Sequence, residues 1–424
     1  MQFPPQAVVG GGDFETVALV FGLVLVGGAL VSGIARRSFL SLTALFVLAG
    51  FALGEGGAEV LSFDPTGDFV GDLAVVALIV ILFRDGIEVE VEMLQREWRL
   101  PFRKLVLAMP LTAGLVALAA HVLTDLSWTE SFLLGALLSP TDPVLSSSVV
   151  TNPRVPRLVR HSLNLESGMN DGLALPAVLA FAAALRVGDS DFVWWKFVLQ
   201  DVTLGLVFGL AVGFIASRLM PRGRGRLESI PAHQLSLYAL GVAFAAYGAT
   251  TLPSAGNGLI AVYVCAITLG ILRPDIAKTF EDRAEDIIEV VKVAIFVVFG
   301  ALLSFGGLFE DGWAAVAIVA FTLLVARPVA IFAALVRTRT DVPTRAFMAW
   351  FGPKGVATMT FSLLVLADTG IAANERLFNL AALVVFVSII VHGLTDTPGA
   401  NWIARHAERV EAETEAVDAE PAPA

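Results

Sequence analysis

Long apolar stretches recur along this chain and constrain its fold more than any other feature. A helix needs about 20 mostly apolar residues to span a membrane. We count thirteen such stretches, at residues 14–34, 38–54, 68–86, 103–124, 129–150, 160–186, 196–219, 233–251, 256–272, 285–306, 313–336, 344–367 and 376–396. Of the 424 residues, 56% are hydrophobic and 16% are charged, which is too little charge to cover so much apolar surface in water. The sequence therefore predicts an all-α polytopic membrane protein with 13 transmembrane helices and excludes a soluble enzyme.

The positions of the basic residues support this count. Alternate loops between the stretches hold 21 of the 28 Lys and Arg residues, and the opposite loops hold three. Lys104, near the start of the fourth stretch, is assigned to the first set. Because cytoplasmic loops collect basic residues, we predict a multi-pass protein of the plasma membrane, with its N-terminus outside and its C-terminus in the cytoplasm.

The remaining composition excludes several partners and groups. A net charge of −11 argues against a nucleic-acid partner. The single cysteine, Cys265, excludes a disulfide framework, a cysteine-based zinc site and an iron–sulfur cluster, and we expect no cofactor. We predict an extracytoplasmic N-terminus at residues 1–13, a transmembrane domain at 14–396, and a disordered acidic tail at 397–424 that is too short and polar to form a regulatory domain.

Prolines interrupt the fifth stretch, which reads Ser139-Pro140-Thr141-Asp142-Pro143 at this point. Each proline lacks a backbone donor and frees a carbonyl one turn earlier. Inside a membrane, such an unwound segment is tolerated only where protein or a water-filled cavity meets it. We interpret this segment as a functional break around a carboxylate. The alternative is a simple proline kink with a hydrated aspartate.

The twelfth stretch has a similar break, Phe351-Gly352-Pro353-Lys354-Gly355, and here the charge within the break is a lysine. The fifth and twelfth stretches are seven apart, so they cross the membrane in opposite directions. This arrangement is typical of two inverted six-helix repeats joined by a linking span. Where two broken helices cross, Asp142 and Lys354 would act as counter-charges for the exposed helix ends.

The sixth stretch carries two buried carboxylates, Glu166 and Asp171, which point about 140° apart around a helix. Arg327, well inside the eleventh stretch, needs an anion, and we predict that it pairs with Glu166. The alternative is that each meets water separately. Asp171 then has no permanent partner, and burial disfavours its charged form, so a proton and a cation can compete for it. The alternative is a structural aspartate paired with Lys292 or Lys354.

Taken together, these residues resemble the cation–proton antiporters, and specifically their electroneutral NhaP/NHE branch. The resemblance rests on the thirteen stretches, the Thr141-Asp142-Pro143 break, the segment from Glu166 to Asp171, and the break around Lys354. It implies the following residue roles. Asp171 binds the proton and the cation, Ser167, Asp142 and the Thr141 carbonyl are ligands or close supports, Asn170 marks one-for-one exchange, and Glu166 with Arg327 forms a stabilising ion pair.

The same resemblance implies how the domain is divided. A core made of residues 103–186 and 313–396 would shift, like an elevator, against a dimer scaffold made of residues 14–86 and 196–306. The chain would be a homodimer in the lipid bilayer. It would hold no metal beyond the transported monovalent cation.

Two positions depart from the family pattern. Many relatives have an acidic ligand in the third span, within a Phe-Glu-Gly-Gly-like stretch. Here Phe83-Arg84-Asp85-Gly86 places an arginine at that point, and Asp85 beside it becomes a further candidate. The alternative is that Asp85 only pairs with Arg84 near the inner surface. Lys354 stands where relatives usually have an arginine, and a lysine keeps the charge without the planar fork.

We therefore expect a secondary active antiporter that exchanges Na⁺, K⁺ or Li⁺ for H⁺ by alternating access at Asp171. The main alternative is a sodium-coupled organic-anion symporter with similar broken helices. An intramembrane aspartyl protease would also need two membrane aspartates, but its Gly-x-Gly-Asp motif is absent, since this chain reads Gly168-Met169-Asn170-Asp171. A passive channel would conduct without proton coupling.

Overall fold

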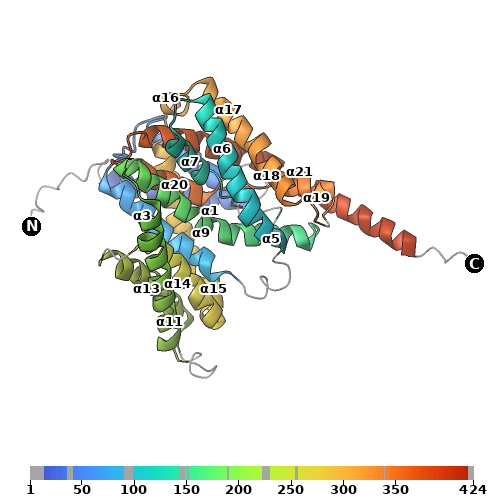
Figure 1. Cartoon of the computed structure of the whole chain (residues 1–424), viewed down its shortest axis with the longest axis horizontal. Coiled ribbons are helices and arrows are strands. Elements are labelled where there is room, and N and C mark those ends of the chain that lie inside the picture. Colours follow the sequence, from blue (N-terminus) through green and yellow to red (C-terminus); the bar gives the residue numbers. More distant parts are fainter. Residues whose placement is uncertain are drawn as a thin grey trace, which may run out of the picture.

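The computed structural model describes residues 14–35, 42–89, 99–142, 149, 152–188, 191–221, 230–253, 256–338 and 340–418. Helices account for most of these residues (Figure 1). At several starts the local sequence explains the boundary. Ser127 and Glu130 form a reciprocal capping box before α7 (Trp128–Leu137). The Asn257 side chain accepts from two backbone N–H groups at the start of α14 (Gly258–Leu272).

Each of the thirteen predicted stretches contains helix in the part of the chain that is described. Three of the helices include a π-helical segment, labelled η1, η3 and η4. The remaining elements are α1 (Phe14–Ala35), α2 (Leu42–Leu53), α3 (Asp68–Ile87), α5 (Arg99–Arg103), η1 (Lys104–Ala108), α6 (Met109–Leu123), α9 (Arg157–Val187), α10 (Trp194–Phe197), η3 (Val198–Thr203), α11 (Leu204–Leu219), α13 (Ala232–Thr251), α15 (Pro274–Ala301), α16 (Phe305–Leu308), α17 (Trp313–Phe321), η4 (Thr322–Ala326), α18 (Arg327–Ala334), α19 (Val342–Trp350), α20 (Val356–Leu366) and α21 (Asn374–Asp418).

By length and composition, at least five of the described helices could cross a membrane. A sixth candidate is α14 together with the start of α15, bent by 114° at the break between them. The remaining predicted spans are shorter or more polar as helices, so the figure of 13 stays a prediction. The five continuous segments are Arg99–Leu123, Arg157–Val187, Trp194–Leu219, Trp313–Ala334 and Asn374–Val410.

The helices are arranged in two groups that meet at α3, α9 and α20. Helices α11, α13, α14 and α15 lie on one side, and α6, α7, α17 and α18 lie on the other (Figure 1). Helix α11 packs along α14, where Gly209 faces the Ala261 backbone and Gly213 faces the Cys265 carbonyl. Small residues at such positions let helix backbones approach closely. Helix α3 in turn packs against α14, α9 and α20, which brings the two groups together.

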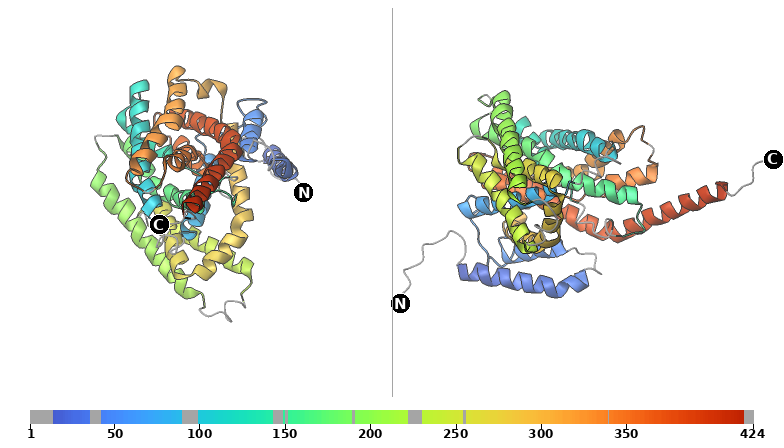
Figure 2. Two further views of the ribbon diagram at one scale, coloured as in Figure 1. Left: turned by 90° about the vertical axis from the view of Figure 1, so that its right-hand side faces the viewer. Right: turned by 90° about the horizontal axis from the view of Figure 1, so that it is seen from below.

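The tail differs from the sequence prediction. Helix α21 continues through residues 397–418, where we expected disorder, and it projects from the body of the molecule (Figures 1 and 2). Ala400 and Ile403 on this extension are buried against the body, and Glu408 forms an exposed ion pair with Arg154 at 3.1 Å. The tail therefore keeps enough apolar contact to remain helical up to Asp418. Residues 1–13 and 419–424 lie outside the described part of the chain.

Candidate functional site

The two proline breaks lie side by side. Helix α7 ends at Leu137 and α19 ends at Trp350, and the chain after each is not helical. The Asp142 N–H donates to the Pro353 carbonyl at 2.8 Å, so the backbones of the two breaks are directly joined. The Ala136 carbonyl, which Pro140 frees, accepts from the Ser139 hydroxyl at 3.0 Å. The unwound backbone of each break is thus met by protein, as an unwound segment inside a membrane requires. Pro143 itself lies outside the described residues.

The charge within each break meets the end of the other broken helix. Lys354 is fully buried, and its Nζ donates to the Pro140 carbonyl at 3.2 Å, just beyond the carboxyl end of α7. The Asp142 side chain lies directly against Gly355, the residue that precedes α20. A cation near the carboxyl end of a helix and an acid near the amino end each interact favourably with the helix dipole. This placement fits the predicted counter-charge roles.

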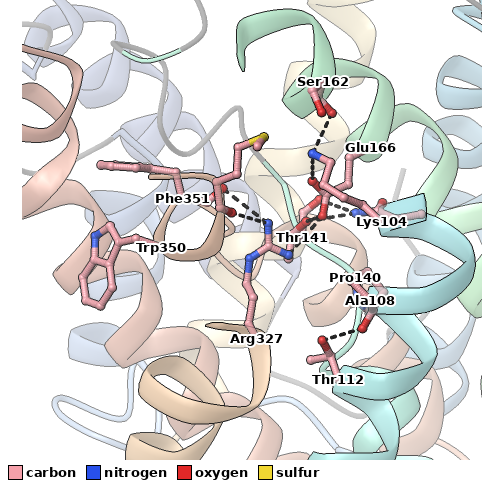
Figure 3. A network of polar contacts seen from close by, with 12 residues as sticks. Lys104, Ala108, Thr112, Pro140, Thr141, Ser162, Glu166, Arg327, Trp350 and Phe351 are labelled. Carbon is pink, nitrogen blue, oxygen red and sulfur yellow. Dashed lines mark hydrogen bonds and ion pairs between the residues drawn. The ribbon is translucent and has the colours of Figure 1, made fainter. Parts of the chain in front are cut away.

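Glu166 lies between two buried cations (Figure 3). Arg327 Nη1 contacts Glu166 Oε1 at 3.0 Å, so the predicted ion pair forms. Lys104 Nζ contacts Glu166 Oε2 at 2.6 Å and also donates to the Ser162 carbonyl at 3.0 Å. The assignment of Lys104 to a cytoplasmic loop is therefore wrong: its side chain is completely buried. Its place inside the fourth apolar stretch was the signal that could have identified it.

Thr141 connects this ion network to the residue beside Asp171. The Thr141 hydroxyl lies 3.5 Å from Glu166 Oε1. The Asn170 amide donates to the Thr141 carbonyl at 2.6 Å and approaches the Thr141 hydroxyl at 3.2 Å. The buried Asn170 Oδ1 accepts no hydrogen bond from the described residues. An amide oxygen is thus left available for a cation or a water molecule.

Asp171 and Asp85 face each other from α9 and α3. Both are buried, at 5% and 6% exposed, and their carboxyl groups lie close enough to share a hydrogen bond. Two carboxyl groups can hydrogen-bond only if one of them carries a proton. Asp142 interacts electrostatically with both. No Lys or Arg among the described residues lies within ion-pair distance of Asp171, which argues against a structural pair with Lys292 or Lys354.

Asp85 also contacts Arg84 at 3.5 Å, and Arg84 pairs with Glu88 at 2.8 Å. The side chains of Arg84 and Glu88 are about a quarter exposed, at 26% and 28%, so this end of α3 lies near the surface of the molecule. Asp85 therefore pairs with Arg84 and also lies next to Asp171. From the sequence alone, the ion pair and a place in the cation site were alternatives. The Ser167 side chain lies outside the described residues. No cluster of three or more His, Cys, Asp or Glu suited to a metal ion occurs in the part described.

A cavity of about 520 Å³ lies at the opposite end of α9. It is lined by residues of α9, α20, α3, α13 and the start of α14, among them Val178, Arg186, Asp201 and Tyr247. Val178 is about two helical turns from Asp171 along α9. The cavity therefore lies about two helical turns along α9 from the carboxyl pair.

Two antiporters from bacteria are similar in sequence to most of this chain. The K(+)/H(+) antiporter NhaP of Alkalimonas amylolytica is 25% identical over 390 residues, covering 91% of this chain and 66% of that protein. The K(+)/H(+) antiporter NhaP2 of Shewanella sp. (strain ANA-3) is 24% identical over 389 residues, covering 90% and 66%. The chain thus spans 66% of the length of these curated relatives.

The fold is also that of a solved antiporter. The sodium proton antiporter MjNhaP1 from Methanocaldococcus jannaschii superposes with a TM-score of 0.75 at 19% identity, covering 89% of this chain and 98% of that one. Residues 22–402 match the family described as "Sodium/hydrogen exchanger, transmembrane". Because this match extends over nearly the whole helical region, the chain belongs to the transmembrane sodium/hydrogen exchanger family.

Proposed function

We propose that this chain is a secondary active antiporter that exchanges a monovalent cation for H⁺ at a site centred on Asp171. The observation that carries the proposal is the close approach of the buried Asp171 and Asp85 carboxyl groups, which can share one proton. Removing the shared proton leaves two adjacent negative charges away from water, which is costly unless a cation replaces it. The proton and the cation then compete for the same binding site.

The surrounding oxygens suit an alkali cation. Asn170 Oδ1 is buried without a hydrogen-bond donor among the described residues, and Asp142 lies within electrostatic reach of the carboxyl pair. Ser167 and Thr141 are further proposed ligands or supports. In this proposal Asp85 and Asp171 share one proton. Replacing that proton with one cation transfers no net charge, so we propose electroneutral one-for-one exchange. The ion is Na⁺ or K⁺, with Li⁺ as a third candidate.

The fold supports alternating access around this site. The cavity at the far end of α9 lies between the proposed core, residues 103–186 and 313–396, and the proposed scaffold, residues 14–86 and 196–306. We propose 13 spans in two inverted six-helix repeats, a homodimer in the plasma membrane, and an N-terminus outside the cell. The joined breaks of α7 and α20 and the small-residue packing of α11 on α14 are consistent with this division.

The organic-anion symporter has less support. Such a transporter needs basic groups that can face its substrate. Arg327 and Lys104 both bind Glu166, and Lys354 donates to the Pro140 carbonyl, so the three buried cations nearest the breaks have partners already. The relatives described above are named as antiporters.

The test is proton movement in proteoliposomes that carry an acid-inside pH gradient. Na⁺, K⁺ and Li⁺ are added in turn, with and without a clamp on the membrane potential. We expect at least one cation to collapse the gradient in the wild type, independently of the clamp, and none to do so in Asp171→Asn. Asp72→Asn, an exposed aspartate on the same helix as Asp85, is the matched control and should transport normally. Transport that persists in Asp171→Asn, or its absence in the wild type, would overturn the proposal.

A further inference from the structure

Lys104 is a second buried cation on a carboxylate that already has one. Glu166 carries a single negative charge, and Arg327 pairs with it at 3.0 Å. Lys104 adds a 2.6 Å contact although its side chain is 0% exposed. A fully buried lysine loses its hydration, and one shared carboxylate repays this only in part. Stabilisation of the ion pair alone therefore does not account for Lys104.

The two cations hold different oxygens of the carboxylate. Lys104 holds Oε2, and Arg327 holds Oε1 (Figure 3). Lys104 is itself fixed by the Ser162 carbonyl, one helical turn before Glu166. Held at both oxygens, the carboxylate cannot rotate freely, and Oε1 stays directed at the Thr141 hydroxyl.

The contacts that orient Glu166 continue through Thr141 to Asn170, the residue next to Asp171. The Asn170 side-chain amide donates to the Thr141 carbonyl oxygen at 2.6 Å and to the Thr141 hydroxyl oxygen at 3.2 Å. With its amide nitrogen held in this way, Asn170 directs Oδ1 away from Thr141, and that oxygen has no donor among the described residues. A continuous set of contacts therefore runs from Lys104 through Glu166 and Thr141 to Asn170.

Both cations lie next to π-helical segments on separate helices. The segment η1 begins at Lys104, and η4 ends at Ala326, immediately before Arg327. A π-helical turn has one residue more than an α-helical turn and shifts the direction of the side chains around it. Such turns are rare and occur frequently at functional sites. Two of them at the two cations that bind Glu166 indicate that the arrangement depends on specific helix geometry.

We propose that Lys104 is a positioning residue of the cation site. It fixes the Glu166 carboxylate, which orients Thr141 and thereby presents Asn170 Oδ1 to the cation at Asp171. This inference rests on the proposed function and assigns to Lys104 an effect on cation affinity that a purely structural residue would not have.

The test compares the apparent cation KM of Lys104→Met with that of the wild type, at equal amounts of folded protein in proteoliposomes. We expect the KM to rise about threefold to tenfold, while the maximal rate stays within about twofold. The exposed Lys196→Met is the matched control and should leave the KM unchanged. An unchanged KM in Lys104→Met, with only lower thermal stability or a lower maximal rate, would overturn the proposal.

A double-mutant cycle tests the route. Thr141→Val removes the hydroxyl that faces Glu166, so adding Lys104→Met to it should raise the KM little further, whereas a full additional increase would contradict the route through Thr141. If Lys104→Met does not fold, Lys104→Gln keeps a donor without the charge, and an unchanged KM there overturns the inference equally. Absence of exchange in the wild type would refute the proposed function, whereas exchange with an unchanged KM refutes only the role of Lys104.

Discussion

Replacing Glu166 by glutamine tests whether the buried ion network holds the core together. The substitution keeps the shape of the side chain but leaves Lys104 and Arg327, whose side chains are 0% and 8% exposed, without a negative partner. Removing one partner of a buried ion pair costs about 3–5 kcal/mol. With a shift of about 2 °C per kcal/mol for a chain of this size, the melting temperature should fall by about 6–10 °C.

The assay is thermal denaturation of the purified protein in detergent, followed by the loss of the monodisperse peak in size-exclusion chromatography. Glu408→Gln is the matched control, because its pair with Arg154 is exposed and should contribute about 0–1 kcal/mol. Its melting temperature should change by less than about 2 °C. If Glu166→Gln melted as the wild type and the control do, the buried network would not stabilise the core and the reasoning would be refuted.

Two further substitutions test the helix breaks and the tail. Gly355→Ala would place a methyl group against the Asp142 side chain. We expect this overpacking to destabilise the protein by about 1–3 kcal/mol and to abolish exchange in proteoliposomes. Gly241→Ala is the control, because its methyl group would enter open space, and this variant should exchange normally. For Asp341, partial burial raises the pKa, but hydrogen bonds from the first turn of α19 and from His406 outweigh it and lower the pKa. Asp341 should therefore stabilise the fold above its ordinary pKa of 3.8 and lose this effect as the pH falls through the lower value in the folded protein. The melting temperatures of the wild type and Asp341→Asn should begin to converge below about pH 4. A constant difference between pH 7 and pH 3 would contradict this.

The sequence predicted the features that depend on local chemistry. Apolar length identified where the helices lie, and proline chemistry identified the breaks around Asp142 and Lys354. The Glu166–Arg327 pair could be predicted because opposite charges inside apolar stretches must find partners. These inferences need only the composition of each stretch.

Features that depend on how helices pack were not predictable in the same way. The contact between Asp85 and Asp171 exists because α3 packs on α9, and no periodicity within either helix encodes that pairing. Lys104 was misassigned because it lies at the boundary of an apolar stretch, where a lysine side chain is expected to reach the membrane surface. The helical tail was missed because its few apolar residues, such as Ile403, become significant only once the body supplies a surface for them.

The central claim is that a proton and a cation compete for Asp171, and the most direct test is the pH dependence of the apparent cation KM. If one proton excludes one cation, the KM should rise by up to about tenfold for each unit of decreasing pH, while the maximal rate at saturating cation stays constant. A KM that is independent of pH, with only the maximal rate changing, would show that the proton and the cation bind at separate places and would contradict the account.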